Sequence, residues 1–310
     1  MRRNAGLQTV IVALIAMSTV TCDLSTTTKV NAATATRTLL TDSPFPYDRV
    51  ARVDLYIVSV SASLSADTMA TAGGNFMILA SPNRRINVLA LQGGVTDELG
   101  AVNIPAGAIK AVRLVIDTDS SSITLANGSV LTGSSTPGIH WQSSAGRPTL
   151  NAQIHDQIIV PDSGATIVID YDVGEAFIQP QDVDPTSTDQ GFIFSPVLRA
   201  IDKKRSAAIS GTVRAHTSSG AAVANASLRL YLGNPNNPEN TWPAIATAKT
   251  DANGAFKFAY IPRSDFWTQQ GVSYIVAADP PSGSGLGRQL VRNVIATKGQ
   301  ETAIGVVILP

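Results

Sequence analysis

The chain has 310 residues, with 23 basic and 23 acidic side chains and a formal net charge of zero. Phosphate contacts need clustered lysine and arginine, so this balance, with no basic stripe, excludes a nucleic-acid partner. The 44% of hydrophobic residues are enough for packed cores, the length favours about two domains, and a single cysteine excludes an internal disulfide bond.

Residues 1–22 have the three parts of an export signal. Arg2 and Arg3 form a basic start, residues 10–17 form a short apolar core, and Cys22 follows. The core is shorter than the roughly 20 residues that a bilayer-spanning helix needs. A cysteine at the end of such a core resembles the lipobox of bacterial lipoproteins, in which the thiol is acylated and the cysteine becomes the mature N-terminus.

Two interpretations of this segment remain open. Where a lipobox usually has Leu and a small residue, the chain has Thr19 and Thr21, so secretion with cleavage near Cys22 or after Ala32 is the alternative to lipidation. Residues 23–37, rich in Thr, Ala and Ser, are predicted to be a flexible tether. We therefore expect an exported protein of the bacterial cell envelope, anchored to a membrane through Cys22, or else a secreted protein.

After the tether, apolar runs are short, β-branched and separated by Gly, Pro, Asn, Asp and Ser, with no sustained helical period. This pattern predicts an all-β fold of two tandem β-sandwiches. The first is expected over residues 38–202. Its candidate strands cover residues 36–41, 50–64, 75–80, 85–91, 109–117, 123–125, 149–160, 165–171 and 191–201.

Alternation in the 50–64 strand places the odd-numbered residues from Val53 to Ser61 on one face. Tyr56, Val58 and Val60 are then expected on the other face. Both faces are largely apolar, which predicts a strand at the centre of a sheet in a sandwich.

The basic triplet from Lys203 to Arg205 predicts a linker over residues 203–207, before a second sandwich over 208–310. Seven short strands at turn spacing are typical of an immunoglobulin-like sandwich. A β-hairpin is predicted at Asp251-Ala-Asn-Gly254, because Asn and Gly tolerate positive φ and Asp caps the turn. The candidate strands cover residues 209–216, 226–232, 244–250, 255–260, 272–278, 289–296 and 302–309.

The second segment carries an ordered set of motifs: Ile-Ser-Gly-Thr-Val at 209–213, Ala-Ala-Val-Ala-Asn-Ala at 221–226, Thr-Asp-Ala-Asn-Gly-Ala-Phe-Lys-Phe at 250–258 and Tyr-Ile-Pro at 260–262. The set resembles a carboxypeptidase-regulatory-like domain of the transthyretin-like sandwich type. The resemblance covers about residues 206–310 and implies an accessory domain without catalytic residues. Related stalk repeats lock themselves with an isopeptide bond from a first-strand Lys. Here that strand carries Arg214 instead, so self-crosslinking is not expected.

The first segment also has a family resemblance. The resemblance rests on these residues: Leu-Thr-Asp-Ser-Pro at 40–44, the strand at 53–60, Ile-Pro-Ala-Gly at 104–107 leading into 112–116, and the runs 168–173 and 194–200. They resemble a family of bacterial envelope proteins called domain of unknown function 4382, many of them lipoproteins. The resemblance covers about residues 38–202 and implies no particular activity. The Gly- and Ser-rich stretch 128–146 departs from the pattern and is predicted to be an inserted loop.

Two carboxylate pairs are candidate metal ligands. Asp117 with Asp119, and Asp170 with Asp172, are spaced two apart and share a face if the backbone is extended. Ca²⁺ is bound by such oxygen ligands, and it is the one metal or cofactor that the sequence suggests. The alternative is that these residues cap strand ends in solvated loops. The same pairs are the candidates for glycosidase chemistry, but no pattern places them across a cleft.

Two tryptophans form the candidate binding site. If the strands of the second sandwich alternate in direction, the connections that carry Trp242 and Trp267 share one end of it. There they could stack on sugar rings or anchor a protein, with polar neighbours Asn240, Asp265 and Gln269. The alternative is that both tryptophans close the end of the core.

Catalysis is not expected. His140 and His155 could act as a general base for a serine, but no Gly-x-Ser-x-Gly turn accompanies them. His155 is expected on a strand, at its surface or half-buried. The sequence therefore predicts a non-catalytic envelope protein that binds a glycan or an envelope protein, or assembles a surface. The alternative is a secreted carbohydrate-binding module.

Overall fold

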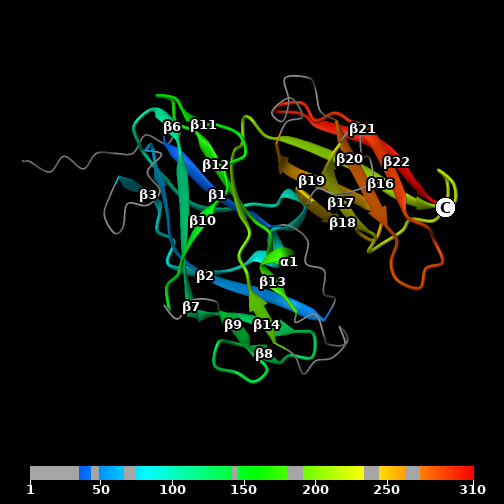
Figure 1. Cartoon of the computed structure of the whole chain (residues 1–310), viewed down its shortest axis with the longest axis horizontal. Coiled ribbons are helices and arrows are strands. Elements are labelled where there is room, and N and C mark those ends of the chain that lie inside the picture. Colours follow the sequence, from blue (N-terminus) through cyan, green and yellow to red (C-terminus); the bar gives the residue numbers. More distant parts are fainter. Residues whose placement is uncertain are drawn as a thin grey trace, which may run out of the picture.

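The computed structural model describes residues 35–42, 49–65, 75–141, 146–179, 191–233, 244–262 and 273–310. These residues form β-strands, one 3-10 helix, η1 (Val88–Gly94), and one short α-helix, α1 (Val173–Ala176) (Figure 1). The predicted all-β fold is confirmed. The expected signal peptide, Cys22 and most of the tether lie outside the described residues. Within the described ranges, no helix is long and apolar enough to cross a membrane.

The first sandwich packs two main sheets against one core. One sheet has the strand order β15–β12–β1–β5, with β1 and β12 parallel. The other has the order β10–β7–β2–β3, with β4 also paired to β2 and β8 paired to β7. Their bounds are β1 (Thr36–Asp42), β2 (Val50–Ser63), β3 (Phe76–Ala80), β4 (Arg84–Asn87), β5 (Asp97–Val102), β7 (Ala111–Leu125), β8 (Val130–Leu131), β10 (Thr149–Ala152), β12 (Thr166–Tyr171) and β15 (Leu198–Asp202).

Shorter pairs complete this sandwich. β6 (Gly107–Ile109) pairs with β11 (Ile158–Val160). β14 (Phe192–Phe194) lies between β13 (Phe177–Ile178) and β9 (Ile139–Trp141). The predicted insert at 128–146 therefore contributes β8 and β9 to the sandwich, in the part of it that is described.

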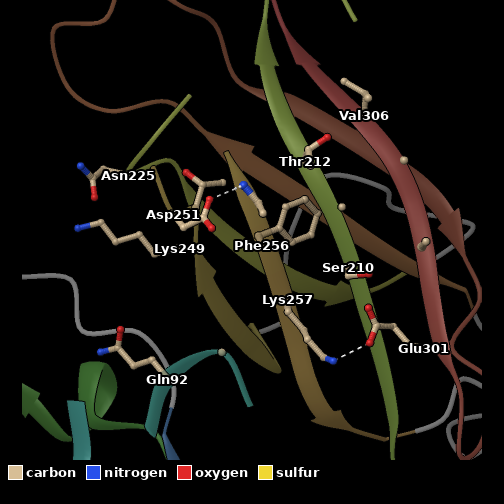
Figure 2. A pocket seen from close by; sticks show the side chains of 16 residues that line it. Gln92, Ser210, Thr212, Asn225, Lys249, Asp251, Phe256, Lys257, Glu301 and Val306 are labelled. Atoms are coloured by element: carbon tan, nitrogen blue, oxygen red, sulfur yellow. Dashed lines mark hydrogen bonds and ion pairs between the residues drawn. The ribbon is translucent and has the colours of Figure 1, made fainter. Parts of the chain in front are cut away.

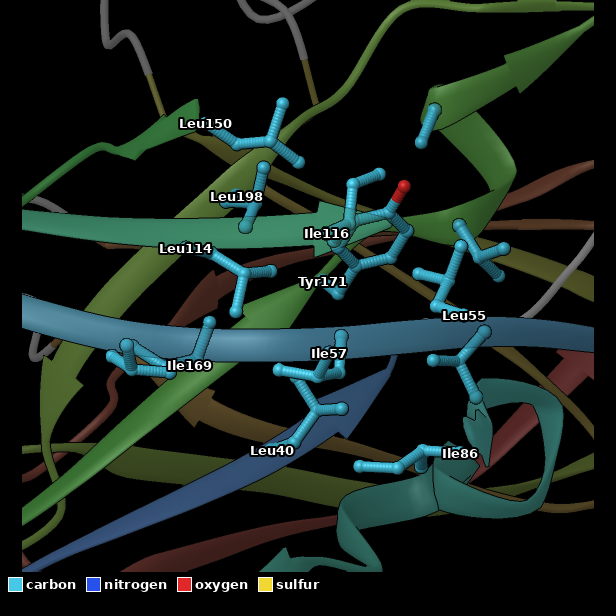
Figure 3. Close-up of a cluster of buried hydrophobic side chains, with 14 of the residues drawn as sticks. Leu40, Leu55, Ile57, Ile86, Leu114, Ile116, Leu150, Ile169, Tyr171 and Leu198 are labelled. Atoms are coloured by element: carbon cyan, nitrogen blue, oxygen red, sulfur yellow. The ribbon is translucent and has the colours of Figure 1, made fainter. Parts of the chain in front are cut away.

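The core of the first sandwich lies between its two sheets (Figure 3). Leu55 and Ile57 of β2 and Leu114 of β7 are at most 1% exposed, as are Ile169 and Tyr171 of β12. Fully burying an aliphatic side chain of this size contributes about 1.5–3 kcal/mol. β2 is paired on both sides, so its predicted central position is confirmed.

The predicted faces of β2 are correct only in its first half. Val53 and Ile57 are buried in the core as expected. The register with β7 then shifts between Ile57 and Ser59, and Val60 and Ala62 enter the core instead of the odd-numbered serines. Such an irregularity exchanges the faces of a strand. The assignment of Val60 to the face opposite Ile57 was therefore wrong.

Several predicted strand boundaries were also wrong. The 85–91 strand ends as β4 at Asn87 and continues as η1, while the 109–117 and 123–125 strands are largely one long strand, β7. The 149–160 strand divides into β10 and β11, and the 191–201 strand into β14 and β15. β5 was missed because Leu99 is its one large buried apolar residue.

In the ranges that the structure describes, the second sandwich has the seven strands that the sequence predicts. One sheet has the order β19–β16–β22 and the other β18–β17–β20–β21. Ile209, Phe258, Tyr274 and Val276 are buried at its centre. The strand bounds are β16 (Ala207–Ala215), β17 (Ser227–Leu232), β18 (Ala246–Lys249), β19 (Ala255–Ile261), β20 (Tyr274–Asp279), β21 (Gln289–Val294) and β22 (Glu301–Leu309).

The turn at Asp251–Gly254 forms as expected, but the hairpin does not. The Asp251 carboxylate accepts backbone hydrogen bonds from Asn253 and Ala255, both at 2.8 Å, and Gly254 has a φ of +74°. β18 and β19, however, belong to different sheets. The turn carries the chain from one sheet to the other, so the hairpin prediction was wrong.

Candidate functional site

A short basic turn connects the two sandwiches. The core of the first extends to Ala200 and that of the second starts at Ala207, so residues 203–206 of the predicted linker lie between them, while Ala207 already belongs to β16. Within the linker, Arg205 forms an ion pair with Asp156 at 3.0 Å. This contact holds the linker against the first sandwich.

Tyr260 of β19 joins the second sandwich to the first. The register between β16 and β19 shifts near Tyr260, which has a φ of +52°. Positive φ is rare for an aromatic residue and marks a strained position. The Tyr260 hydroxyl donates a hydrogen bond to the carbonyl oxygen of Gly94 at 3.2 Å, and the Lys203 ammonium lies 6.0 Å from the centre of its ring.

Gly94 allows the two sandwiches to approach closely. Its φ is +89°, and a Cβ at this position would lie 2.7 Å from the Cβ of Ala259. η1 is itself held to the first sandwich by Thr41, whose hydroxyl lies 3.1 Å from the carbonyl oxygen of Leu91 and 2.8 Å from that of Val95. Thr41 of the first sandwich and Tyr260 of the second therefore both hold the η1 region in place.

A groove of about 850 Å³ opens beside this contact, over the outer face of the β19–β16–β22 sheet (Figure 2). Ser210 and Thr212 of β16 lie along its floor. The register places Ala303 of β22 beside Ser210, and Ala255 of β19 beside Thr212. These side chains are small and leave the groove open, and Phe256 of β19 also lines it.

Both sandwiches contribute to the borders of the groove. Gln92 and Gly93 of η1 come from the first sandwich. Asn225, Lys249 and Asp251 come from the second and lie on the same side of β16 as Gln92 in Figure 2. The groove thus depends on the contact between the sandwiches.

The groove is lined by both positive and negative side chains. The lining includes Lys249 and Lys257 and the carboxylates of Asp251 and Glu301. Lys257 pairs with Glu301 at 2.5 Å. Hydrogen bonds from Lys257 and Ser210 lower the pKa of Glu301, so this carboxylate is ionised at neutral pH. The formal charges of the described lining residues cancel.

A buried charged cluster lies near the same contact. Arg199 of β15 lies 2.9 Å from the carboxylate of Asp170 and 3.5 Å from that of Asp172. Asp172 also caps α1 by accepting a hydrogen bond from the backbone N–H of Glu175 at 3.2 Å. Nearby, Asp42 accepts one from the backbone N–H of Val173 at 3.1 Å.

Burial determines the protonation of this cluster. It raises the pKa of Asp172 to about 6, against the attraction of Arg199, and it also raises the pKa of Asp170. Burial and the charges of Asp42 and Asp172 raise the pKa of Tyr171 well above its ordinary value. One guanidinium thus balances two carboxylates that have been removed from water.

The cluster reaches the second sandwich. A small, partly open cavity of about 20 Å³ lies among Asp42, Asp170 and Thr247 of β18. A cavity of this size is large enough for about one water molecule. The interior charges of the first sandwich therefore lie close to the contact with the second.

The predicted carboxylate pairs have arginine partners. Asp170 and Asp172 contact Arg199, and Asp117 lies 3.0 Å from Arg147 while Asp119 is exposed. Among the residues that the structure describes, no group of three or more His, Cys, Asp or Glu side chains could hold a metal ion. The calcium site stays a prediction.

The predicted tryptophan site lies outside the described residues, as do Trp242, Trp267, Asn240, Asp265 and Gln269. The described ends of the two connections are adjacent. The backbone N–H of Gly233 donates to the carbonyl oxygen of Ser273 at 2.8 Å, and Leu232 is paired with Tyr274. The first connection therefore leaves, and the second arrives, at one end of the β17–β20 pair.

The histidines have separate surroundings. His155 lies between β10 and β11, so its predicted place in a strand was wrong. It is half-buried, and burial and the Arg199 charge lower its pKa, which favours the neutral form. His140 lies on β9, where it is exposed.

Sequence reasoning missed Tyr260, Gly94 and Arg199 as functional candidates. A signal existed for the last of these: Arg199 and Asp170 are charged residues that stand directly between apolar neighbours in the sequence of a strand. Charges in such positions are expected to pair. No local pattern indicates that Tyr260 meets Gly94, because the two are 166 positions apart.

Solved structures resemble the chain only weakly. A 9R-lipoxygenase from Cyanothece PCC8801 is 12% identical with a TM-score of 0.22, over 44% of this chain and 19% of that chain. The minor pilin GBS52 of Streptococcus agalactiae is 9% identical with a TM-score of 0.22, over 88% and 95%. The major pilin BcpA of Bacillus cereus is 9% identical with a TM-score of 0.23, over 89% and 69%. Comparison with curated proteins finds no match.

The family comparison is decisive for the first sandwich. The model of the family described as Domain of unknown function (DUF4382) matches residues 34–196, which is more than half of the chain. The match confirms the resemblance that the sequence shows over this region. Its range extends from β1 through β14, so it covers every strand of the first sandwich that the structure describes except β15. The chain therefore belongs to the DUF4382 family.

Proposed function

We propose that this protein is exported to the bacterial cell envelope, is anchored there by lipid on Cys22, and acts by binding without catalysis. The observation that carries the proposal is the position of Cys22, after a basic and apolar segment and before a tether rich in Thr, Ala and Ser. One acyl chain binds a membrane only marginally, so stable anchoring requires several chains on Cys22.

The chemistry of the described residues supports a binding role. The buried carboxylates of Asp170 and Asp172 are engaged by Arg199, while His140 lies on β9 and His155 between β10 and β11. These residues do not form a nucleophile, base and oxyanion set. We assign the second sandwich as a carboxypeptidase-regulatory-like accessory domain, and its motifs and seven strands support this assignment.

The anchor is tested by expressing the full chain and its Cys22→Ser variant in a bacterial host. We expect the wild type in the membrane fraction, with the intact mass of a multiply acylated protein, and the variant in the soluble fraction. Ser25→Ala, three residues further along the tether, is the matched control and should behave as the wild type. An unmodified, secreted wild-type chain would overturn the lipid anchor.

A second candidate function is carbohydrate binding through Trp242 and Trp267. The adjacent ends of their two connections, at Gly233 and Ser273, favour it. Exposed aromatic rings at one end of a sandwich can stack on sugars. Trp242→Ala and Trp267→Ala should then reduce polysaccharide retention in affinity electrophoresis with unchanged melting temperature. A loss of stability without any change in retention would indicate that the rings pack in the core.

A further inference from the structure

We infer that the groove between η1 and the β19–β16–β22 sheet is a binding site for a neutral glycan. The inference rests on the proposed binding role and assigns it a site and a ligand class. The proposal takes the groove as the binding site, and not the segments that carry the two tryptophans. Its described residues come from both sandwiches.

The groove is formed before any ligand arrives. Tyr260 and Gly94 hold η1 beside the second sandwich, which places Gln92 and Gly93 along the groove. Its volume of about 850 Å³ lies within the range of about 300–1,000 Å³ typical of small-molecule sites. A preformed site avoids the entropic cost of ordering loops on binding.

The floor suits a glycan better than an extended peptide. Peptides that bind as added strands need free backbone groups at a sheet edge. The floor is centred on β16, which is already paired with β19 and with β22. The groove instead offers side-chain groups: the Thr212 hydroxyl, the amides of Gln92 and Asn225, and the oxygen of Ser210, whose proton is donated to Glu301. Hydroxyl-rich ligands match such donors and acceptors.

The charge balance favours a neutral ligand. Lys257 is paired with Glu301, and Lys249 is accompanied by Asp251. A uronate or phosphate would meet carboxylates as often as ammonium groups, so its desolvation would be poorly compensated. The apolar surface of Ala303 and of Val306, which is 43% exposed, can cover the C–H face of a sugar ring.

The test uses the purified full-length chain and four hexasaccharides in isothermal titration calorimetry. Maltohexaose, cellohexaose and N-acetylchitohexaose are neutral, and hexagalacturonate is the anionic comparison. We expect at least one neutral probe to bind and hexagalacturonate to bind at least tenfold more weakly. Ala303→Trp should fill the floor and weaken the neutral probe at least tenfold. Ala101→Trp, on an exposed position of β5, should not change the affinity.

Two further variants test whether the glycan binds in the groove or at the two tryptophans. Thr212→Val removes a floor hydroxyl at nearly constant volume and should weaken binding several-fold even if Ala303→Trp fails to fold. The double variant Trp242→Ala/Trp267→Ala should keep the wild-type affinity.

Three results would overturn the groove assignment: no binding by any neutral probe, affinity unchanged by Thr212→Val, or tighter binding of hexagalacturonate. Such a result leaves the proposed anchoring untouched if the wild type is acylated and membrane-bound. Glycan binding by a chain that is not acylated would instead remove the anchor and keep the groove.

Discussion

The hydroxyl of Tyr260 in the second sandwich donates a hydrogen bond to the carbonyl oxygen of Gly94 in the first, at 3.2 Å. Gln92 and Gly93, immediately before Gly94, border the groove. The strained backbone of Tyr260 and the positive φ of Gly94 both serve this one contact. The relative position of the two sandwiches and the shape of the groove therefore depend on the same pair of residues.

Gly94→Ala is expected to weaken the contact between the sandwiches. The added Cβ would lie 2.7 Å from that of Ala259, and overpacking of this kind costs about 1–3 kcal/mol. Small-angle scattering should show a larger radius of gyration. Gly128→Ala is the control, because Gly128 has a nearly equal φ of +87° but nothing within 4 Å of its Cβ position. An equal radius of gyration for Gly94→Ala and Gly128→Ala would contradict the prediction.

Arg199→Met is expected to destabilise the first sandwich strongly. It leaves the buried carboxylates of Asp170 and Asp172 without their guanidinium, and breaking a buried pair costs about 3–5 kcal/mol. Arg147→Met is the control, because Arg147 is 65% exposed and surface pairs contribute about 0–1 kcal/mol. Urea unfolding at neutral pH measures both free energies. A cost for Arg199→Met no larger than for the control would refute a stabilising role.

Asp172→Asn is expected to change how stability depends on pH. The folded pKa of Asp172 is about 6, above its ordinary value of 3.8, so the folded state binds the proton more tightly than the unfolded chain. The stability contributed by this proton is complete below pH 3.8 and is lost as the pH rises through about 6. The Asn variant should therefore gain stability relative to the wild type between pH 4 and 7.

Urea unfolding at several values across this pH range measures the difference between the two proteins. Asparagine keeps an oxygen that can cap α1, so the comparison isolates the charge. Asp162→Asn, at an exposed position, is the control. A difference between Asp172→Asn and the wild type that is independent of pH would show that Asp172 is not the titrating group.

The arginine partners favour the alternative to the predicted calcium site, so calcium is expected to leave the melting temperature unchanged. Arg147 and Arg199 already neutralise Asp117, Asp170 and Asp172, and these cations oppose a divalent ion at the same carboxylates. Thermal unfolding in millimolar CaCl₂ and in EDTA tests this. A calcium-dependent increase that disappears in Asp119→Asn would instead establish a site at the Asp117 and Asp119 pair.

Local patterns were sufficient for much of the fold. The seven strands of the second sandwich appear where β-branched runs end at turn residues, because both signals act over a few neighbouring positions. Local patterns did not predict which strands pair with each other or in which register. The shift that moves Val60 into the core and the passage of the chain between sheets at Asp251 depend on which strands become neighbours.

The sequence by itself determined the all-β class, the division near Lys203 into two runs of strands, and the family of the first sandwich. Only the tertiary structure placed Arg199 against Asp170, and Tyr260 against Gly94. The reason is physical: alternation reports whether a side chain is buried, but not its distant partner. The groove is formed by residues from both sandwiches, so it exists only once they are in contact.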